Sequence, residues 1–332
     1  MTQAEDAAVP VKPPISQLPL PTFAVELAPP DVTPWLDGNT GIPGVVSYTS
    51  DLPGPHVALL ALIHGNELAG GIVLDLLLRA ELRPARGRLT FAFANIAACA
   101  RFDPCQPTVS RFVDEDLNRL WDPGLLDGPR VSAELRRARE LRPMLDTVDV
   151  LLDLHSMLWP SDPLILSGQT ARGRALAGQI GAPPLVVADA GHMSGRRIID
   201  YPRFSDPDGA AVALLVEAGQ HWERATVNTS LATVAGLLGH LGIVADHPAL
   251  PVRSAALRPV YAEVTHAITA NTASFAFVQP YRGGDVIARG NTVIARDGET
   301  EVRTFYDDCL LIMPSLRPSR GHTAVRLARF LR

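Results

Sequence analysis

The chain is almost without lysine and has few cysteines. Lys12 is its only lysine, so arginine carries nearly all of its positive charge. Arginine is the better bidentate partner for carboxylates, although the coding bias of a GC-rich genome is the simpler cause of the overall skew. The three cysteines, Cys99, Cys105 and Cys309, are too few for a disulfide framework and lack the spacing of a metal site. We therefore expect a reducing, cytoplasmic location.

Long apolar runs and an excess of basic residues are absent as well. No apolar stretch is long enough to span a membrane, and the N-terminus lacks the basic start and apolar core of a secretory signal. The net charge is -5 with a pI near 6.0, which argues against the basic patch that a nucleic-acid partner requires. We expect a small-molecule partner, no nucleic acid and no membrane, while a homo-oligomer stays open.

A chain of 332 residues is long for one compact domain, so a large domain and a smaller one are expected. Residues 1–22 are rich in proline, which opposes both helix and central strand, and they predict an extended or disordered tail. We assign residues 23–246 to the main domain. Beyond residue 246, prolines and turn signals replace long helical patterns until the last residues, so residues 247–332 predict a β-rich C-terminal domain.

Short apolar runs alternate with helical patterns in the main domain. Strands are expected at residues 56–63, 88–96, 149–155, 163–166, 185–188 and 211–216, and helices at residues 67–82, 132–145, 171–180 and 226–241. Most of the runs are continuous, as in strands that are buried on both faces. This order predicts an α/β fold with a mostly parallel, mixed sheet flanked by helices.

Two histidines and a glutamate stand at the ends of predicted strands. His64 and Glu67 belong to an H-G-N-E motif after the run at 56–63, and His155 closes the next such run within D-L-H-S. Ligands bind at the strand ends of open α/β sheets, and two histidines with one carboxylate form the ligand set of a catalytic zinc site. Asp153 lies on the same side of its strand as His155 and can orient an imidazole. A lone H-x-x-E motif is weak, but D-L-H-S at a matching strand end strengthens it.

A polar segment, R-F-V-D-E-D-L-N-R, lies between these motifs. Its Arg111, Asn118 and Arg119 can together bind a carboxylate and polarise a carbonyl group. The alternative is a solvated loop in which Arg111 pairs with Asp114 or Glu115, and composition alone favours that alternative.

Glu217 follows the apolar run 211–216 in the sequence V-E-A-G. Beside a metal, such a carboxylate can take a proton from water and pass it to a leaving nitrogen. An exposed glutamate at a strand end is an equally frequent alternative. Gly219 would let the backbone turn sharply after it.

These four motifs, in this order between His64 and Gly219, resemble those of the aspartoacylase and succinylglutamate desuccinylase family, relatives of the zinc carboxypeptidases. The segment Y-D-D-C-L-L-I-M-P near the C-terminus also looks like bacterial members. The resemblance implies a carboxypeptidase-like α/β zinc domain, here residues 23–246, followed by a β-rich C-terminal domain. It implies one zinc ion per chain, bound by His64, Glu67 and His155.

The same resemblance implies roles for the remaining motif residues. Arg111 would polarise the scissile carbonyl and stabilise the oxyanion, and Glu217 would be the general base. Asn118 and Arg119 would hold the substrate carboxylate. In aspartoacylase, an arginine upstream of the catalytic glutamate and a C-terminal tyrosine complete the pocket, and the candidates here are Arg196, Arg197 and Arg203 for the first and Tyr281 and Tyr306 for the second.

Taken together, the motifs predict a cytoplasmic zinc amidohydrolase, a deacylase that cleaves the amide (non-peptide C–N) bond of a small N-acyl amino acid. A zinc carboxypeptidase acting on short peptides would use the same residues, and it is disfavoured if the C-terminal domain overhangs the zinc, as the resemblance implies. A catalytically silent metal- or ligand-binding protein is the other alternative. Such a protein has no need of both Glu217 and Arg111.

Overall fold

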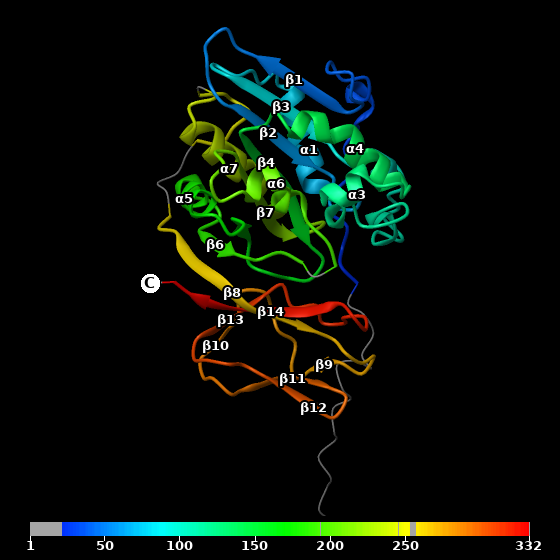
Figure 1. Ribbon diagram of the computed structural model, residues 1–332, viewed down its shortest axis with the longest axis vertical. Helices are drawn as coiled ribbons and strands as arrows, with labels where there is room; N and C mark the ends of the chain where they lie inside the picture. Colours follow the sequence, from blue (N-terminus) through cyan, green and yellow to red (C-terminus); the bar gives the residue numbers. More distant parts are fainter. Residues whose placement is uncertain (1–21, 193, 245, 253–256, 332) are drawn as a thin grey trace, which may run out of the picture. The chain divides into compact units, whose positions relative to one another are not determined.

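The computed structural model describes residues 22–192, 194–244, 246–252 and 257–331 (Figure 1). Its contacts divide them into two compact units, one holding residues 23–264 and 329–331 and the other residues 265–328. Strand β8 (Val260–Thr269) contributes to both. The domain bounds 23–246 and 247–332 stay a prediction, and the predicted tail lies outside the described residues except for Thr22.

The larger unit is built on a mixed sheet with the strand order β1-β3-β2-β4-β7-β5-β6-β8. Its strands before β8 are β1 (Val45–Thr49), β2 (His56–Ala61), β3 (Arg88–Phe93), β4 (Val150–Met157), β5 (Leu164–Leu166), β6 (Leu185–Ala188) and β7 (Val212–Gln220). Neighbours β3, β2, β4 and β7 are parallel, whereas β1 pairs antiparallel with β3 and β5 pairs antiparallel with β7. The predicted α/β fold with a mostly parallel sheet is confirmed.

Strands β2 and β4 at the centre of the sheet are buried along their whole length because helices cover the sheet. The helices are α1 (Leu68–Arg79), α2 (Ile96–Cys99), α3 (Pro123–Asp127), α4 (Ala133–Leu145), α5 (Ala171–Ile180), α6 (Pro202–Ser205) and α7 (Arg224–His240). Helix α7 packs against α1 and α5, and the three share one core with alternate residues of the strands, such as Val57 and Leu59 of β2. Complete burial of each such side chain contributes about 1.5–3 kcal/mol to folding.

The parallel strands bring distant motifs to one edge of the sheet. Ala61 at the end of β2 is paired with Leu154 of β4. One residue further along β4, His155 is paired with Glu217 of β7. The segment that follows β2 therefore begins beside the carboxyl ends of β4 and β7, which is where an open α/β sheet binds its ligands.

Some elements differ from the sequence prediction. Strand β1 was not predicted, and it forms the antiparallel edge beside β3. The predicted strand 88–96 ends at Phe93, because Asn95 caps the short helix α2 by accepting a hydrogen bond from the Ala98 N–H at 3.2 Å. The last residues, where the sequence analysis left room for a helical pattern, form strand β14 (Thr323–Phe330) instead.

The smaller unit consists of short antiparallel strands. They are β9 (Ala276–Phe277), β10 (Val286–Ile287), β11 (Val293–Asp297), β12 (Thr300–Arg303) and β13 (Cys309–Ile312), followed by β14. Strands β12, β11 and β9 form one small sheet, and β13 pairs with β10 and β14. Its core contains Phe275, Phe277 and Leu311, so this unit has a hydrophobic core of its own.

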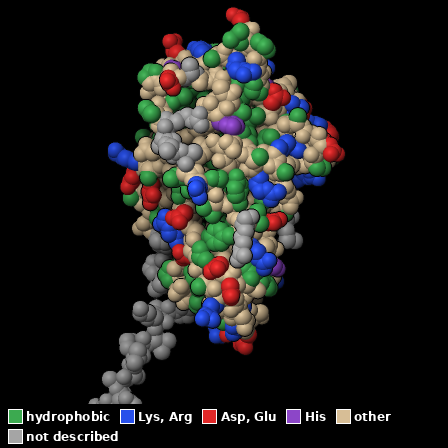
Figure 2. Space-filling model, turned by 90° about the vertical axis from the view of Figure 1, so that its left-hand side faces the viewer, with side chains coloured by type: hydrophobic (Ala, Val, Ile, Leu, Met, Phe, Trp, Pro, Cys, Tyr) green, Lys and Arg blue, Asp and Glu red, His purple; other side chains and the backbone are tan. Residues whose placement is uncertain are grey.

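The surface has a mixed character. On the face that Figure 2 shows, arginines, acidic side chains and apolar side chains are interspersed among the described residues. None of the described helices combines the length and the apolar composition that crossing a membrane requires.

Candidate active site

His64 and Glu67 lie in the segment between β2 and α1. Leu62 adopts a φ of 61°, which turns the chain as it leaves the sheet, and Glu67 immediately precedes α1 as its N-cap residue. Gly65 between them packs directly on neighbouring backbone, because a Cβ atom there would lie 2.4 Å from the Cys99 nitrogen. The H-G-N-E motif therefore needs its glycine to bring the two polar side chains into the fold.

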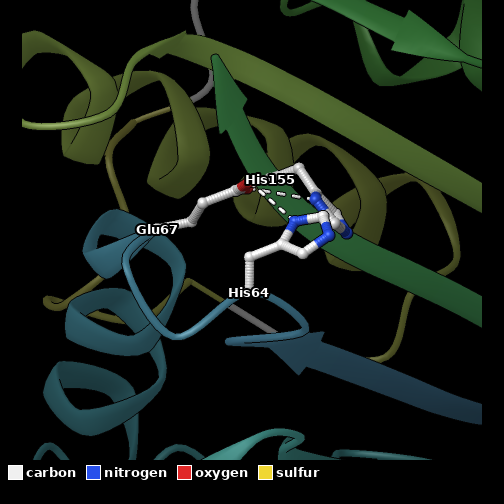
Figure 3. Close-up of side chains that lie close together, drawn as sticks. All are labelled: His64, Glu67 and His155. Atoms are coloured by element: carbon white, nitrogen blue, oxygen red, sulfur yellow. Dashed lines mark hydrogen bonds and ion pairs between the residues drawn. The ribbon is translucent and has the colours of Figure 1, made fainter. Parts of the chain in front are cut away.

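The structure brings His64, Glu67 and His155 together. One ligand atom from each lies within 4.8 Å of the other two, and the three residues are only 3–4% exposed (Figure 3). His64 Nδ1 lies 2.7 Å from Glu67 Oε1, and His155 Nδ1 lies 3.0 Å from Glu67 Oε2. This buried group can hold a metal ion.

Each histidine has a second carboxylate on its other ring nitrogen. His64 Nε2 lies 2.9 Å from Asp116 Oδ1, and His155 Nε2 lies 2.7 Å from Asp153 Oδ2, the partner that the strand alternation predicted. Metal-binding histidines commonly donate one ring N–H to a carboxylate in this way, which fixes the ring and directs the other nitrogen to the metal. In both histidines, Nδ1 thus faces the Glu67 carboxylate and Nε2 faces a second carboxylate.

The electrostatics of the group also fit a cation. Burial alone would raise the pKa of Glu67, but His64 and His155 lower it well below its ordinary value. Burial alone would lower the pKa of His155, but Asp153 and Glu67 raise it well above its ordinary value. Because the carboxylates favour a positive charge at this position, a bound metal ion could supply that charge in place of a proton.

Glu217 lies beside this group on strand β7. Its Oε2 is buried and has no hydrogen-bond partner, and its pKa is raised to about 8 by burial and by the charge of Glu67. Gly219 takes a φ of 136° and lies inside β7, where the pairing with β4 shifts register between Glu217 and Gln220. A buried carboxyl group whose pKa lies near neutrality can accept and return a proton.

Arg111 reaches the same centre. Its Nη1 lies 3.3 Å from Glu67 Oε1 and its Nη2 lies 3.2 Å from Asp116 Oδ2. Its Nη2 is also 2.8 Å from His64 Nε2, a hydrogen bond only when that nitrogen carries no proton. The two acids considered as its partners in a solvated loop lie elsewhere: Asp114 accepts from the N–H of Ala133, and Glu115 pairs with Arg130.

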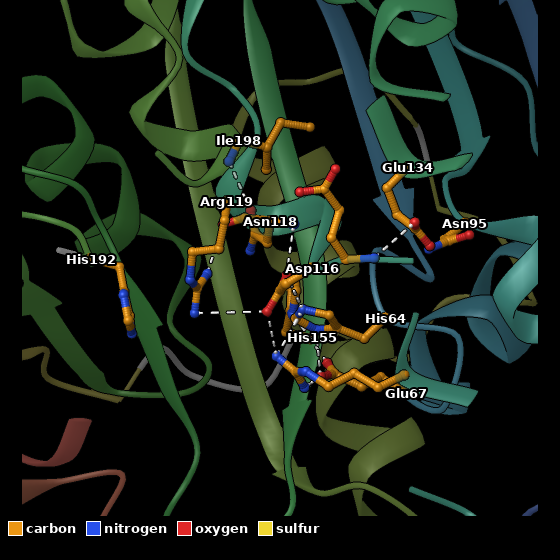
Figure 4. A network of polar contacts seen from close by, with 12 residues as sticks. His64, Glu67, Asn95, Asp116, Asn118, Arg119, Glu134, His155, His192 and Ile198 are labelled. Atoms are coloured by element: carbon orange, nitrogen blue, oxygen red, sulfur yellow. Dashed lines mark hydrogen bonds and ion pairs between the residues drawn. The ribbon is translucent and has the colours of Figure 1, made fainter. Parts of the chain in front are cut away.

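Asn118 and Arg119 follow on a single 3-10 turn, Leu117–Arg119 (Figure 4). The Asn118 side-chain oxygen accepts a 2.8 Å hydrogen bond from the Ile198 N–H, which identifies the other terminal atom of the amide as the NH2 donor. Arg119 Nη1 donates to the Asn118 carbonyl at 2.7 Å, and its Nη2 lies 3.9 Å from Asp116 Oδ2. Both arginines of the motif thus converge on Asp116.

The further pocket candidates are held in different ways. Arg197 is buried, with Nη1 2.9 Å from Asp189 and Nε 2.7 Å from Asp200. Arg196 pairs with Asp122, and Arg203 donates to the Val148 carbonyl at the amino end of β4, whereas His155 lies towards the other end. Tyr281 packs on Phe277 in the smaller unit, where the Tyr306 hydroxyl lies 2.6 Å from Thr265 Oγ1.

Sequence reasoning missed two parts of this site. Asp116 stands beside two other acids, and no spacing rule distinguishes it from them. The Ser156 N–H donates to Glu67 Oε2 at 2.9 Å, and its hydroxyl lies 2.8 Å from Nδ1 of buried His221. Burial lowers the pKa of His221 to about 4, so this imidazole is neutral. The sequence signal that could have identified His221 was its position shortly after V-E-A-G.

Comparisons with known proteins agree with this geometry. A family model described as the succinylglutamate desuccinylase/aspartoacylase catalytic domain matches residues 53–237. No curated protein shows a significant match. The succinylglutamate desuccinylase of Vibrio cholerae superposes with a TM-score of 0.65 at 19% identity, over 86% of this chain and 85% of its own.

Two other solved structures share the fold. An aspartoacylase family protein from Mesorhizobium loti has a TM-score of 0.62 at 20% identity, over 87% of this chain and 89% of its own. The product-bound ectoine utilization protein from Ruegeria pomeroyi has a TM-score of 0.58 at 18% identity, over 86% and 88%. The family match covers more than half of the chain and includes every motif residue from His64 to Glu217. The chain therefore belongs to the succinylglutamate desuccinylase/aspartoacylase family.

Proposed function

We propose that this protein is a zinc-dependent amidohydrolase that removes the acyl group from a small N-acyl amino acid. The observation that carries the proposal is the convergence of three groups: the buried His64, Glu67 and His155, the unpaired carboxyl oxygen of Glu217, and the guanidinium of Arg111. A binding protein needs a ligand set, whereas a hydrolase needs in addition a proton acceptor and an oxyanion partner.

The donor set favours zinc. Two imidazole nitrogens and one carboxylate oxygen are the ligands of many catalytic zinc sites, which keep a further position open. We assign one zinc ion per chain to His64 Nδ1, His155 Nδ1 and the Glu67 carboxylate. When bound there, zinc acidifies water and polarises a carbonyl oxygen.

The other residues have distinct tasks in this proposal. Arg119 and the NH2 group of Asn118 bind the substrate carboxylate through charge-assisted hydrogen bonds. Arg111 donates to the carbonyl oxygen, and this contact strengthens as negative charge develops on that oxygen. Glu217 takes a proton from the attacking water and delivers it to the nitrogen of the departing amine.

The proteins that share the fold support an acyl-amino-acid substrate. The names succinylglutamate desuccinylase and aspartoacylase both describe removal of an acyl group from an amino acid. We also propose a cytoplasmic location, which agrees with Cys99, Cys105 and Cys309 being unpaired.

A substrate panel tests the proposal. N-acetyl, N-succinyl and N-formyl amino acids should be incubated with the zinc-loaded protein, with the chelated protein and with the chelated protein after zinc is restored. We expect hydrolysis of at least one class, lost on chelation and regained with zinc. If the panel stays intact while zinc is bound stoichiometrically, the protein is a binding protein and the proposal is wrong.

A further inference from the structure

Glu134 is completely buried, although it is neither a predicted ligand nor a predicted catalytic group. It lies in the first turn of α4, where the helix dipole favours a negative charge. A buried carboxylate is costly unless hydrogen bonds satisfy it, so the donors around it show what it holds in place.

Four donors converge on this carboxylate, and three of them are consecutive backbone N–H groups. Oε1 accepts from the Val113 N–H at 2.6 Å and from the Asn95 side chain at 3.0 Å. Oε2 accepts from the N–H groups of Asp114 at 3.0 Å and Glu115 at 3.2 Å. These three N–H groups belong to a stretch without helix or strand, so Glu134 supplies the acceptor that secondary structure does not.

The stretch held by Glu134 joins the two halves of the arginine segment. Arg111 precedes it by two residues, and Asp116 follows it directly. The segment is fastened at its start, where the Gly65 N–H donates to the Arg111 carbonyl at 3.1 Å, and again at Asn118 through Ile198. Between these two points, Glu134 ties it to α4 and, through Asn95, to the end of β3 (Figure 4).

The connection is reciprocal. Asp114 Oδ2 accepts from the Ala133 N–H at 2.7 Å, so the segment caps α4 while α4 holds the segment. Ser132 caps the same helix by accepting from the Leu135 N–H at 2.9 Å. Glu134 therefore contributes more than a helix cap, because its carboxylate faces the loop.

We propose that Glu134 is a positioning residue that sets the geometry of Arg111, Asn118 and Arg119 for the substrate carboxylate and the scissile carbonyl. The inference rests on the proposed function for its catalytic meaning, while the hold on residues 113–115 can be measured without substrate. Glu134 touches none of the three proposed zinc ligands in the described hydrogen bonds, so metal binding is expected to survive its replacement.

The test compares Glu134→Gln with Glu140→Gln, a matched control on the same helix whose side chain is 52% exposed. The amide can accept through one oxygen only, and its NH2 group would face backbone N–H donors. We expect amide hydrogen exchange in residues 112–116 to quicken at least tenfold in Glu134→Gln and to stay at the wild-type rate in the control. Zinc content should match the wild type.

Activity supplies the second readout. The wild-type preference for an N-acyl amino acid over its carboxamide, measured as the ratio of kcat/KM values, should fall at least tenfold in Glu134→Gln because the carboxylate partners lose their position. Equal exchange and equal preference in the two variants would overturn the proposal. So would a loss of zinc with faster exchange throughout the larger unit, which would indicate a general structural role. If the wild type hydrolyses nothing, the proposed function fails, and the exchange comparison still decides the role of Glu134.

Discussion

Replacing Glu217 by glutamine tests the proposed chemistry most directly. The change keeps the size of the side chain and removes its capacity to accept a proton. Because Glu217 Oε2 has no hydrogen-bond partner and Glu217 is not one of the three clustered ligands, the variant should fold and bind zinc like the wild type. Only the rate of the proton-transfer step should fall.

General acid–base catalysis contributes about 10²–10⁴-fold to a rate, so turnover of Glu217→Gln should fall by that factor, or about 2.7–5.5 kcal/mol in activation free energy. Hydrolysis of one N-acyl amino acid under saturating conditions, together with zinc content by elemental analysis, measures both expectations. Glu223→Gln is the matched control, because Glu223 is exposed at the start of α7. Near-normal turnover in Glu217→Gln with zinc bound would refute the assignment of the base.

Glu217→Gln should also change how the stability of the metal-free protein depends on pH. Burial and the nearby Glu67 raise the pKa of Glu217 from 4.5 to about 8 in the metal-free protein. The unfolded chain therefore loses this proton before the folded protein does, and stability falls as the pH rises between these values. Glutamine does not titrate, so the melting temperature of metal-free Glu217→Gln should exceed that of the metal-free wild type by a margin that grows from about pH 5 to pH 8 and then levels off. A margin that shrinks over this range would contradict the raised pKa.

His155→Ala should lose most of the zinc, whereas His240→Ala, on the exposed end of α7, should keep about one ion per chain; equal zinc in both by elemental analysis would remove His155 from the ligand set. Arg119→Ala should raise KM about tenfold or more, since a charge-assisted pair contributes about 1.5–3 kcal/mol in ground and transition states alike. Arg111→Ala should instead depress kcat, because its contact strengthens as charge develops on the carbonyl oxygen. If the wild type hydrolyses a carboxamide as fast as the corresponding acid, the proposed contact of Arg119 and Asn118 with the substrate carboxylate is excluded. In a series of N-acyl amino acids and longer peptides, small substrates should react fastest, and rates that rise with peptide length would favour a carboxypeptidase.

Much of the fold could be predicted because it depends on local pattern. The run at 56–63 is apolar after His56, and its first six residues form β2, in which all six are buried. Leu135, Ala138, Leu141 and Leu145 recur at helical spacing and form the buried side of α4. The edge strand β1 escaped prediction, because its partly exposed residues lack the continuous apolar signal of the central strands.

The buried position of Glu134 could have been predicted from the sequence. It precedes Ala138 by four residues and Leu141 by seven, so helical spacing places it on the buried side of α4. An acidic residue at such a position must find donors, and this requirement marks it as a candidate for a structural or functional role. The identity of its donors depends on a loop that precedes it by about 20 residues, and helical spacing carries no information about that loop.

The sequence by itself determined the residue types of the candidate metal site, their places near strand ends and the family, because each follows from residue identity and short-range spacing. Only the tertiary structure decided among the adjacent acids Asp114, Glu115 and Asp116. The first caps α4, the second pairs with Arg130, and the third reaches His64 and both arginines of the segment. The three have nearly the same chemistry, and what separates them is the direction in which an irregular backbone points each side chain. That direction is set by hydrogen bonds to Glu134, Gly65 and Ile198, contacts that form only when the chain folds.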